Sequence, residues 1–278
     1  MTESTTDDGR RTTNTPADAF NQAVDKWVDQ QRTPWMRIKH VTMRSNLIKH
    51  LPQLSASEQP LRILDAGGGT GIESIPFAQA GHHVDLVDYS AEMLGIARAS
   101  IGETHVQGRV ALHHANILDI PKLFADGAFD VVLCHNVMQY VGDPDAVLTA
   151  ISQTLKRGGV FSLISMNRYS LPYREAIFED DLDKAYTAID QRIEMTRIFG
   201  HEVPIYSGEE IVALLPTHDC ELLGHYGIWC MTMYWGNNER KADPILYKKL
   251  ERLELALSGR HPYNLLGRYF QIVAQKQR

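Results

Sequence analysis

The sequence has little cysteine and no long apolar run. Its 278 residues include 3 cysteines, Cys134, Cys220 and Cys230, an odd number without a C-x-x-C pair. They predict neither a disulfide framework nor a zinc site. No apolar run approaches the roughly 20 residues of a membrane span, and the N-terminal residues form no apolar signal segment. We therefore expect a cytoplasmic protein with no membrane partner.

The sequence also lacks an excess of basic residues and the common hydrolase motifs. Its 28 Lys and Arg against 34 Asp and Glu give a net charge of −6. This charge argues against a broad phosphate-binding surface, although it leaves room for a local basic patch. There is no H-E-x-x-H, no G-x-S-x-G and no cluster of metal ligands, so no metal is expected. The composition, 44% apolar and 22% charged, is that of a globular protein.

The order of elements predicts an α/β fold with a doubly wound, mostly parallel sheet. Residues 1–18 predict a disordered tail, and residues 19–59 a helical lid. From residue 60 short apolar strands alternate with helices, which is typical of βαβ units. The expected strands are 61–64, 83–87, 110–113, 131–133 and 160–164, and the expected helices 72–80, 91–100 and 145–155.

The second half of the chain is expected to complete the sheet domain, which spans 60–278. Residues 167–206 interrupt the alternation, with a charged helix over 174–192, and predict a cap insertion over the carboxyl ends of the strands. Ser207 and Glu210 form a capping-box pattern that opens a helix to about residue 215. A strand over 220–229, a helix over 244–257 and a strand over 268–275 follow.

A glycine-rich loop follows the first strand directly and precedes a helix. It reads Asp65-Ala66-Gly67-Gly68-Gly69-Thr70-Gly71. Glycines allow a sharp turn and a close approach of ligand to backbone. Their G-x-G-x-G spacing is tighter than the G-x-G-x-x-G of dinucleotide sites, so it suits a ribose with an amino-acid tail better than two phosphates. The alternative is a turn that serves only strand-to-helix packing.

An acidic residue ends the second strand, where a ribose would lie. Asp88 comes 88 − 71 = 17 residues after Gly71, close to the roughly 20 at which an acid meets ribose hydroxyls. The neighbouring Tyr89 is included in the predicted cofactor site. Alternatively, Asp88 caps the helix that begins at Ala91, but Ser90 is already placed for that role.

The ordered motifs resemble the class I S-adenosylmethionine-dependent methyltransferases. The likeness covers about residues 60–165 and rests on the glycine loop, Asp88, the run 129–135 and the Lys-Arg-Gly-Gly turn at 156–159. It implies a seven-stranded sheet with its last strand inserted antiparallel, and S-adenosylmethionine across the carboxyl ends of the strands. The glycines would contact the methionine part. Asn116 and Ile117 would meet the adenine, although the usual Gly-Asp-Ala reads Ala115-Asn116-Ile117 here.

A narrower likeness concerns the tRNA wobble-uridine carboxyl methyltransferases, which esterify 5-carboxymethoxyuridine. It rests on residues 64–69, Gly81-His82, Pro262-Tyr263 and residues 266–269. It implies that Arg37 binds the cofactor carboxylate and that His135 contacts the methionine part. A cation is physically suited to a buried carboxylate. Arg37 has the alternative of being a solvated surface residue.

The substrate half departs from these tRNA enzymes. Residues 200–207 lack the basic residue expected there, the insertion is acidic and the net charge is negative. We therefore expect a small organic acceptor, with tRNA as the alternative. A second alternative is a module that binds S-adenosylmethionine without methyl transfer. A nicotinamide dehydrogenase has the wrong glycine spacing.

Methyl transfer from a sulfonium needs alignment more than covalent catalysis. The donor is already activated, so the protein orients the acceptor and excludes water. His135 and Tyr169 are the candidate catalytic residues, and Tyr140, Arg168 and Tyr173 the candidate substrate-binding residues. For His135 the alternative is a structural histidine, and for the others it is packing of the insertion onto the core. We expect a monomer or homodimer.

Overall fold

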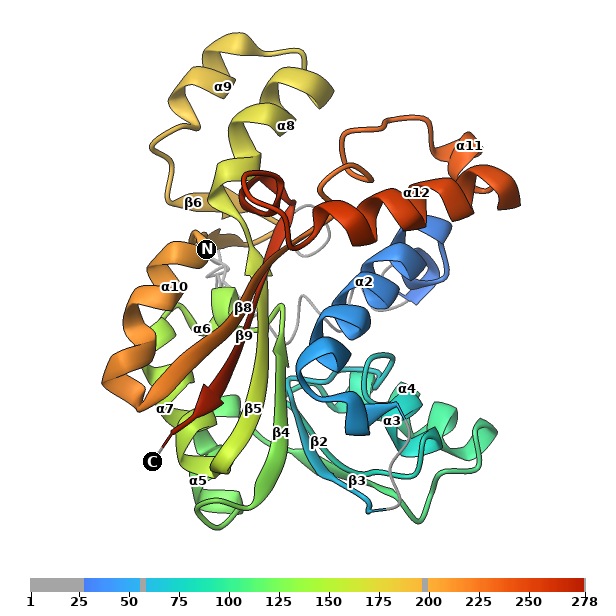
Figure 1. Cartoon of the computed structure of the whole chain (residues 1–278), viewed down its shortest axis with the longest axis vertical. Coiled ribbons are helices and arrows are strands. Elements are labelled where there is room, and N and C mark those ends of the chain that lie inside the picture. The colour runs from blue at the N-terminus through green and yellow to red at the C-terminus, as the bar shows by residue number, and fades with distance from the viewer. Residues whose placement is uncertain (1–27, 56–58, 197–199, 278) are drawn as a thin grey trace, which may run out of the picture.

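A seven-stranded sheet forms the centre of the computed structural model, which describes residues 28–55, 59–196 and 200–277 (Figure 1). Its strands are β1 Arg62–Ala66, β2 His83–Asp88, β3 Val110–His114, β4 Phe129–His135, β5 Leu155–Met166, β8 Cys220–Ile228 and β9 Tyr269–Lys276. Their order is β3-β2-β1-β4-β5-β9-β8. The first five are parallel, and β9 runs antiparallel to both of its neighbours. The predicted doubly wound sheet with an inserted antiparallel strand is confirmed.

Helices cover both faces of the sheet. The α-helices around the sheet are α2 Pro34–His50, α3 Ile75–Gln79, α4 Ala91–Glu103, α5 Ile120–Leu123, α6 Met138–Val141, α7 Pro144–Thr154, α10 Gly208–Leu214, α11 Asn238–Lys241 and α12 Pro244–Leu257. Short 3-10 turns occupy Pro52–Leu54, Ile117–Asp119, Arg168–Ser170, Leu215–His218 and Tyr263–Leu266. Apolar side chains of α2, α3 and α4 pack on one face, and those of α5, α7 and α10 on the other.

The central strands supply both hydrophobic cores because successive side chains of a strand point to opposite faces. In β4, Val131 and Leu133 belong to the core under α3 and α4, whereas Val132 and Cys134 belong to the core under α7. All four are completely buried. A strand covered on both faces is continuously apolar, which explains why β4 could be recognised in the sequence.

The cap insertion differs from its predicted form. In place of one helix over 174–192, two short helices, α8 Leu171–Phe178 and α9 Leu182–Thr187, are followed by the hairpin of β6 Ile193–Met195 and β7 Glu202–Pro204. The prediction of a single helix was wrong because Asp180 adopts a left-handed conformation, with φ 53°, and ends the first helix. Asp181 then caps the second helix by accepting a hydrogen bond from the Lys184 N–H.

Two further local predictions were accurate. Ser207 and Glu210 form the reciprocal capping box at α10, and α12 has the predicted bounds. Helix α3 begins at Ile75, three residues later than expected, with Pro76 in its first turn. The predicted tail, 1–18, and the first part of the predicted lid, 19–27, lie outside the described residues. No helix in the described part of the chain is long and apolar enough to cross a membrane.

Candidate cofactor and acceptor site

The glycine loop is held against the end of β2 by its own backbone. The N–H groups of Gly67 and Gly68 donate to the Val87 carbonyl at 2.8 and 3.1 Å. A Cβ on Gly67 would lie 2.2 Å from Val137 Cγ2, so packing alone requires that glycine. Gly69, with φ +54°, faces open space apart from Asp88 Oδ2 at 3.9 Å. A ligand can therefore approach the backbone at Gly69.

Asp88 joins this loop to the start of α4. Its Oδ2 accepts from the Gly69 N–H at 2.8 Å, and its Oδ1 accepts from the Ser90 N–H at 2.8 Å. Burial raises the pKa of Asp88, although both amide hydrogen bonds oppose that shift. Ser90 itself caps α4 by accepting from Met93 N–H at 3.2 Å. The carboxylate of Asp88 therefore lies at the carboxyl end of β2, beside the open face of Gly69.

A buried acid that the sequence analysis missed, Glu73, lies beneath the loop. Its carboxylate pairs with His135 Nδ1 and lies 3.4 Å from His40 Nδ1. Burial disfavours the charge of Glu73, but these histidines outweigh burial and hold its pKa well below the usual range. The other ring nitrogen of His135 contacts Ser162 Oγ at 2.8 Å. Both nitrogens of His135 are thus engaged.

The same polar chain continues into α2. Gln271 Nε2 donates to Ser162 Oγ at 2.9 Å, and Asn46 Nδ2 donates to Gln271 Oε1 at 3.0 Å. Asn46 also donates to Ser258 Oγ at 2.9 Å. All four side chains are buried. Helix α2 is therefore fixed to the sheet by a satisfied polar network rather than by apolar contacts alone.

Helix α2 also carries Arg44, a partly buried arginine whose charge interacts with that of Glu73. Arg37, the predicted carboxylate ligand, is exposed, and its charge acts on Tyr247 of α12. The Arg44 guanidinium lies 5.7 Å from the Phe77 ring centroid, and its buried Nε has no hydrogen-bond partner. Burial lowers the pKa of Arg44, and the negative charge of Glu73 opposes this. The signal for Arg44 in the sequence is that it follows His40 by four residues, which places the two side chains next to each other on a helix.

Asp65, at the end of β1, is the second group with an unused polar atom. Its carboxyl is buried, and its Oδ2 has no hydrogen-bond partner. Burial raises the pKa of Asp65 to about 7, with Ser74 opposing the shift. The unpartnered Oδ2 of Asp65 can accept a hydrogen bond from an ammonium, and the unpartnered Nε of Arg44 can donate one to a carboxylate. Together they fit a ligand that carries both groups.

The predicted adenine and ribose neighbours have separate environments. Asn116 is exposed, and its side chain accepts from the Leu118 N–H at 2.9 Å. Ile117 is buried in the core under α7. Tyr89 is exposed, with its ring 6.4 Å from that of His114. These residues follow β2 and β3, at the same edge of the sheet as Asp88.

The predicted acceptor residues lie in different surroundings. Tyr140 packs with Tyr269 against the apolar base of the cap. Arg168 instead stacks on Tyr169, at 4.6 Å, and lies 3.6 Å from Glu210 of α10. Tyr173 is 47% exposed, and its ring lies 6.0 Å from that of Tyr234.

An ion cluster that was not predicted joins the cap to the sheet. Glu194 accepts from Arg174 Nη1 at 2.7 Å and from Arg268 Nη2 at 2.9 Å. Burial disfavours the charge of Glu194, but the two guanidinium groups outweigh it and lower the pKa of Glu194. Arg268 Nη2 also contacts Met166 Sδ at 3.2 Å. The cluster could not be read from sequence because its members come from α8, β6 and the residue before β9.

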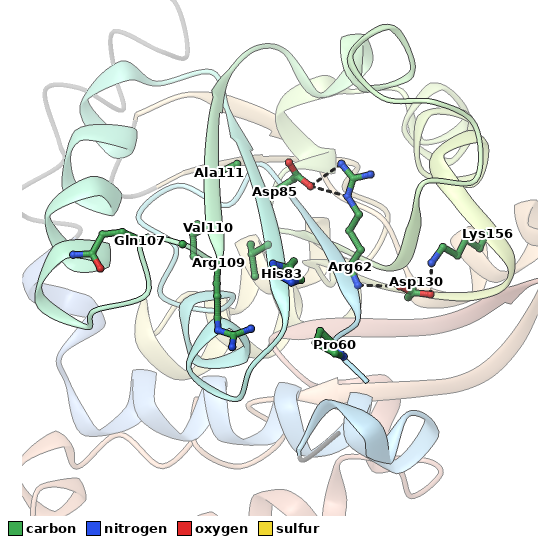
Figure 2. Close-up of a pocket in the computed structure, with 12 residues that line it drawn as sticks. Pro60, Arg62, His83, Asp85, Gln107, Arg109, Val110, Ala111, Asp130 and Lys156 are labelled. Atoms are coloured by element: carbon green, nitrogen blue, oxygen red, sulfur yellow. Dashed lines mark hydrogen bonds and ion pairs between the residues drawn. The ribbon is translucent and has the colours of Figure 1, made fainter. Parts of the chain in front are cut away.

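A surface hollow of about 490 Å³ lies at the opposite, amino-terminal edge of the parallel strands. Figure 2 shows its charged side chains in pairs, Arg62 with Asp85 and Lys156 with Asp130. None of the predicted site residues lines it. Its paired charges explain its polarity without a ligand.

Known proteins support the assignment that this geometry suggests. The model of a family described as a methyltransferase domain matches residues 57–216. The tRNA 5-carboxymethoxyuridine methyltransferase of Escherichia coli is 28% identical over 220 residues, which cover 78% of this chain and 81% of that protein. A ubiquinone biosynthesis O-methyltransferase of Aromatoleum aromaticum is 35% identical over 116 residues, 42% of this chain and 48% of that protein.

Solved structures agree on the fold. A methyltransferase dependent on S-adenosylmethionine, from Thermotoga maritima, has a TM-score of 0.60 and 17% identity, and the match covers 94% of this chain and 99% of that one. The family model spans more than half of the present chain. The chain therefore belongs to the S-adenosylmethionine-dependent methyltransferases.

Proposed function

We propose that the protein transfers the methyl group of S-adenosylmethionine to a small organic acceptor by direct displacement. The observation that carries the cofactor part is the open backbone at Gly69 beside Asp88. Arg44 adds a buried Nε without a hydrogen-bond partner. Asp88 would accept from the ribose hydroxyls, as the spacing predicts. Arg44, in place of Arg37, would bind the carboxylate, and Asp65 would accept from the ammonium.

When bound, the cofactor supplies an activated methyl group on a sulfonium. The residues of the chain have to bind it, align the acceptor and exclude water. His135 serves as a positioning residue for Glu73 in this proposal, because Glu73 and Ser162 occupy both of its ring nitrogens. Tyr140 is the predicted acceptor residue that lies in the apolar base of the cap, beside Tyr269.

The cap favours a small acceptor over tRNA. Its exposed acidic residues are Glu179, Asp180, Asp183, Asp190 and Glu202. A phosphate backbone that approached this surface would be repelled and would release few counterions. The similarity to the E. coli tRNA enzyme favours tRNA as the second candidate.

Titration with S-adenosylhomocysteine tests the cofactor site. Arg44→Met should weaken binding about 10- to 100-fold, because a charged hydrogen-bond partner of the carboxylate is lost. Arg37→Met is the matched control, because Arg37 is an exposed arginine of the same helix. It should change the affinity less than threefold. Calorimetry that detects no binding to the unaltered protein would refute the proposed function.

The acceptor class needs a separate measurement. A gel-shift with total tRNA at moderate salt should show no retarded complex if the acceptor is small. Retardation that falls steeply with salt would instead support tRNA. With an identified substrate, product formation without S-adenosylhomocysteine would indicate a module that binds the cofactor but does not transfer methyl groups.

A further inference from the structure

One buried lysine, Lys39, lies between the cofactor residues and the cap. It is 5% exposed, on the side of α2 that faces the sheet. Its Nζ lies 4.8 Å from the centroid of the Tyr269 ring. Among the described residues, no carboxylate lies within ion-pair distance of this ammonium. A lysine is almost never buried without such a partner, so this position calls for a negatively charged ligand.

The acid that faces Lys39 is already committed elsewhere. The charges of Lys39 and Glu73 act on each other. However, Glu73 forms its ion pair with His135 and approaches His40 at 3.4 Å. The positive charge of Lys39 therefore has no direct counterion in the ligand-free protein.

A second cation contacts the same ring. The Arg268 guanidinium lies 5.2 Å from the centroid of Tyr269. Arg268 shares Glu194 with Arg174, so Arg174, Arg268 and Lys39 bring three positive charges against the two carboxylates of Glu194 and Glu73. The buried Nε of Arg174 also has no hydrogen-bond partner. In a chain whose net charge is −6, this region has a local excess of positive charge.

Aromatic rings enclose the charged groups at the carboxyl edge of the parallel strands. Tyr269 pairs with Met166, the last residue of β5. Its ring lies 5.6 Å from that of Trp229, and Tyr140 packs against the same apolar cluster. The rings of Tyr269 and Trp229 suit an aromatic ligand because they can stack on it. The Lys39 ammonium, which has no ion-pair partner among the described residues, suits a single negative charge on that ligand.

We propose that Lys39, assisted by Arg268, binds the carboxylate of a small aromatic acid, and that this acid is the methyl acceptor. A nucleophilic atom of the acid would form the bond to the methyl carbon while the carbon–sulfur bond of the sulfonium breaks. The sulfur leaves with the bonding pair as S-adenosylhomocysteine, and an acceptor atom that starts neutral loses its proton to solvent. The inference rests on the proposed function and names its acceptor class. A small acid fits better than a phosphate backbone because Lys39 and Arg268 are only 5% and 7% exposed. Lys39 acts here as a specificity residue for the acceptor, whereas Arg44 serves the cofactor.

Ligand-observed NMR on the protein saturated with S-adenosylhomocysteine tests this assignment. The probes are benzoate, phenylacetate and 3-phenylpropionate, each compared with its neutral amide. At least one acid should bind ten times more tightly than its amide, and Lys39→Gln should remove that preference. Lys49→Gln is the matched control, because Lys49 lies on the same helix and stacks on Tyr226 at 5.1 Å. It should retain the preference.

The outcomes separate this inference from the proposed function. Equal binding of all acids and amides, or an equal loss in the Lys49→Gln control, would overturn the acidic-acceptor assignment while leaving the cofactor site intact. Lys39→Gln should change the affinity for S-adenosylhomocysteine by less than threefold. A larger loss would assign Lys39 to the cofactor. A Lys39-dependent gel-shift with tRNA, without binding of any acid, would also overturn the proposal.

Discussion

Asp65 combines two properties at a single residue: it is buried at the end of a strand, and its Oδ2 has no partner. Burial raises the pKa of this carboxyl to about 7 from an ordinary value of 3.8. The folded protein therefore holds a proton there that the unfolded chain releases at lower pH. Asp65 destabilises the ligand-free protein increasingly as the pH rises from about 4 to about 7.

Replacing this carboxyl should flatten the pH dependence of stability. Between pH 5.5 and 8 the unaltered protein should lose about 2 kcal/mol of unfolding free energy relative to Asp65→Asn. The reason is that the Asp65 carboxyl of the folded protein loses its proton in this range, whereas asparagine does not titrate. Urea unfolding at the two pH values measures the difference. Parallel behaviour of the two proteins would show that Asp65 titrates normally.

Local spacing made some residues of the site predictable. The glycine loop and Asp88 each follow a strand directly, so their place at one edge of the sheet follows from the sequence. Arg44 and Lys39, the two cations proposed above, were not predicted, because helical periodicity places several cations on α2 without showing which of them are buried. Their surroundings are set by Phe77 and Tyr269, which lie farther along the chain.

At the scale of elements, the cap is attached to the sheet by a charge cluster. Helix α8 and strand β6 contribute Arg174 and Glu194, and Arg268 precedes β9. Figure 1 shows α8 and α9 projecting beyond the carboxyl edge of the sheet. The frequent charges over 174–192 predicted a longer helix here, whereas the left-handed conformation of Asp180 ends the helix early.

Removing the charge of Glu194 should loosen the cap. Glu194→Gln leaves two buried guanidinium groups without a counterion, which costs about 3 kcal/mol. Hydrogen exchange should accelerate in α8, β6 and β7, while β1 and β4 remain protected. Asp190→Asn, an exposed acid of the same insertion, is the control. Unchanged exchange of the cap in Glu194→Gln would show that its apolar contacts are sufficient.

At the scale of the whole molecule, the sheet order depends on β9. This strand pairs with β5 along seven residues and with β8 on its other side. The alternation of strands and helices predicted the parallel half, and the family likeness supplied the antiparallel insertion. Pairing between such distant segments has no local signal in the sequence.

Truncation after Leu266 tests that dependence. Loss of β9 removes the strand that joins β5 to β8, together with the buried Phe270, Ile272, Val273 and Ala274. We expect no cooperative unfolding transition and no binding of S-adenosylhomocysteine. Near-ultraviolet circular dichroism and calorimetry provide the measurements. A truncated protein that still folds and binds would show that the parallel half is autonomous.

The position of β9 also has a consequence for biosynthesis. Gln271 completes the polar chain to His135, and Tyr269 carries the two cations beside the cap. Tyr269 and Gln271 come late in the sequence, so a nascent chain lacks these side chains until translation passes β9. Prematurely terminated chains would therefore expose an incomplete site to the quality-control machinery of the cell rather than compete for the methyl donor.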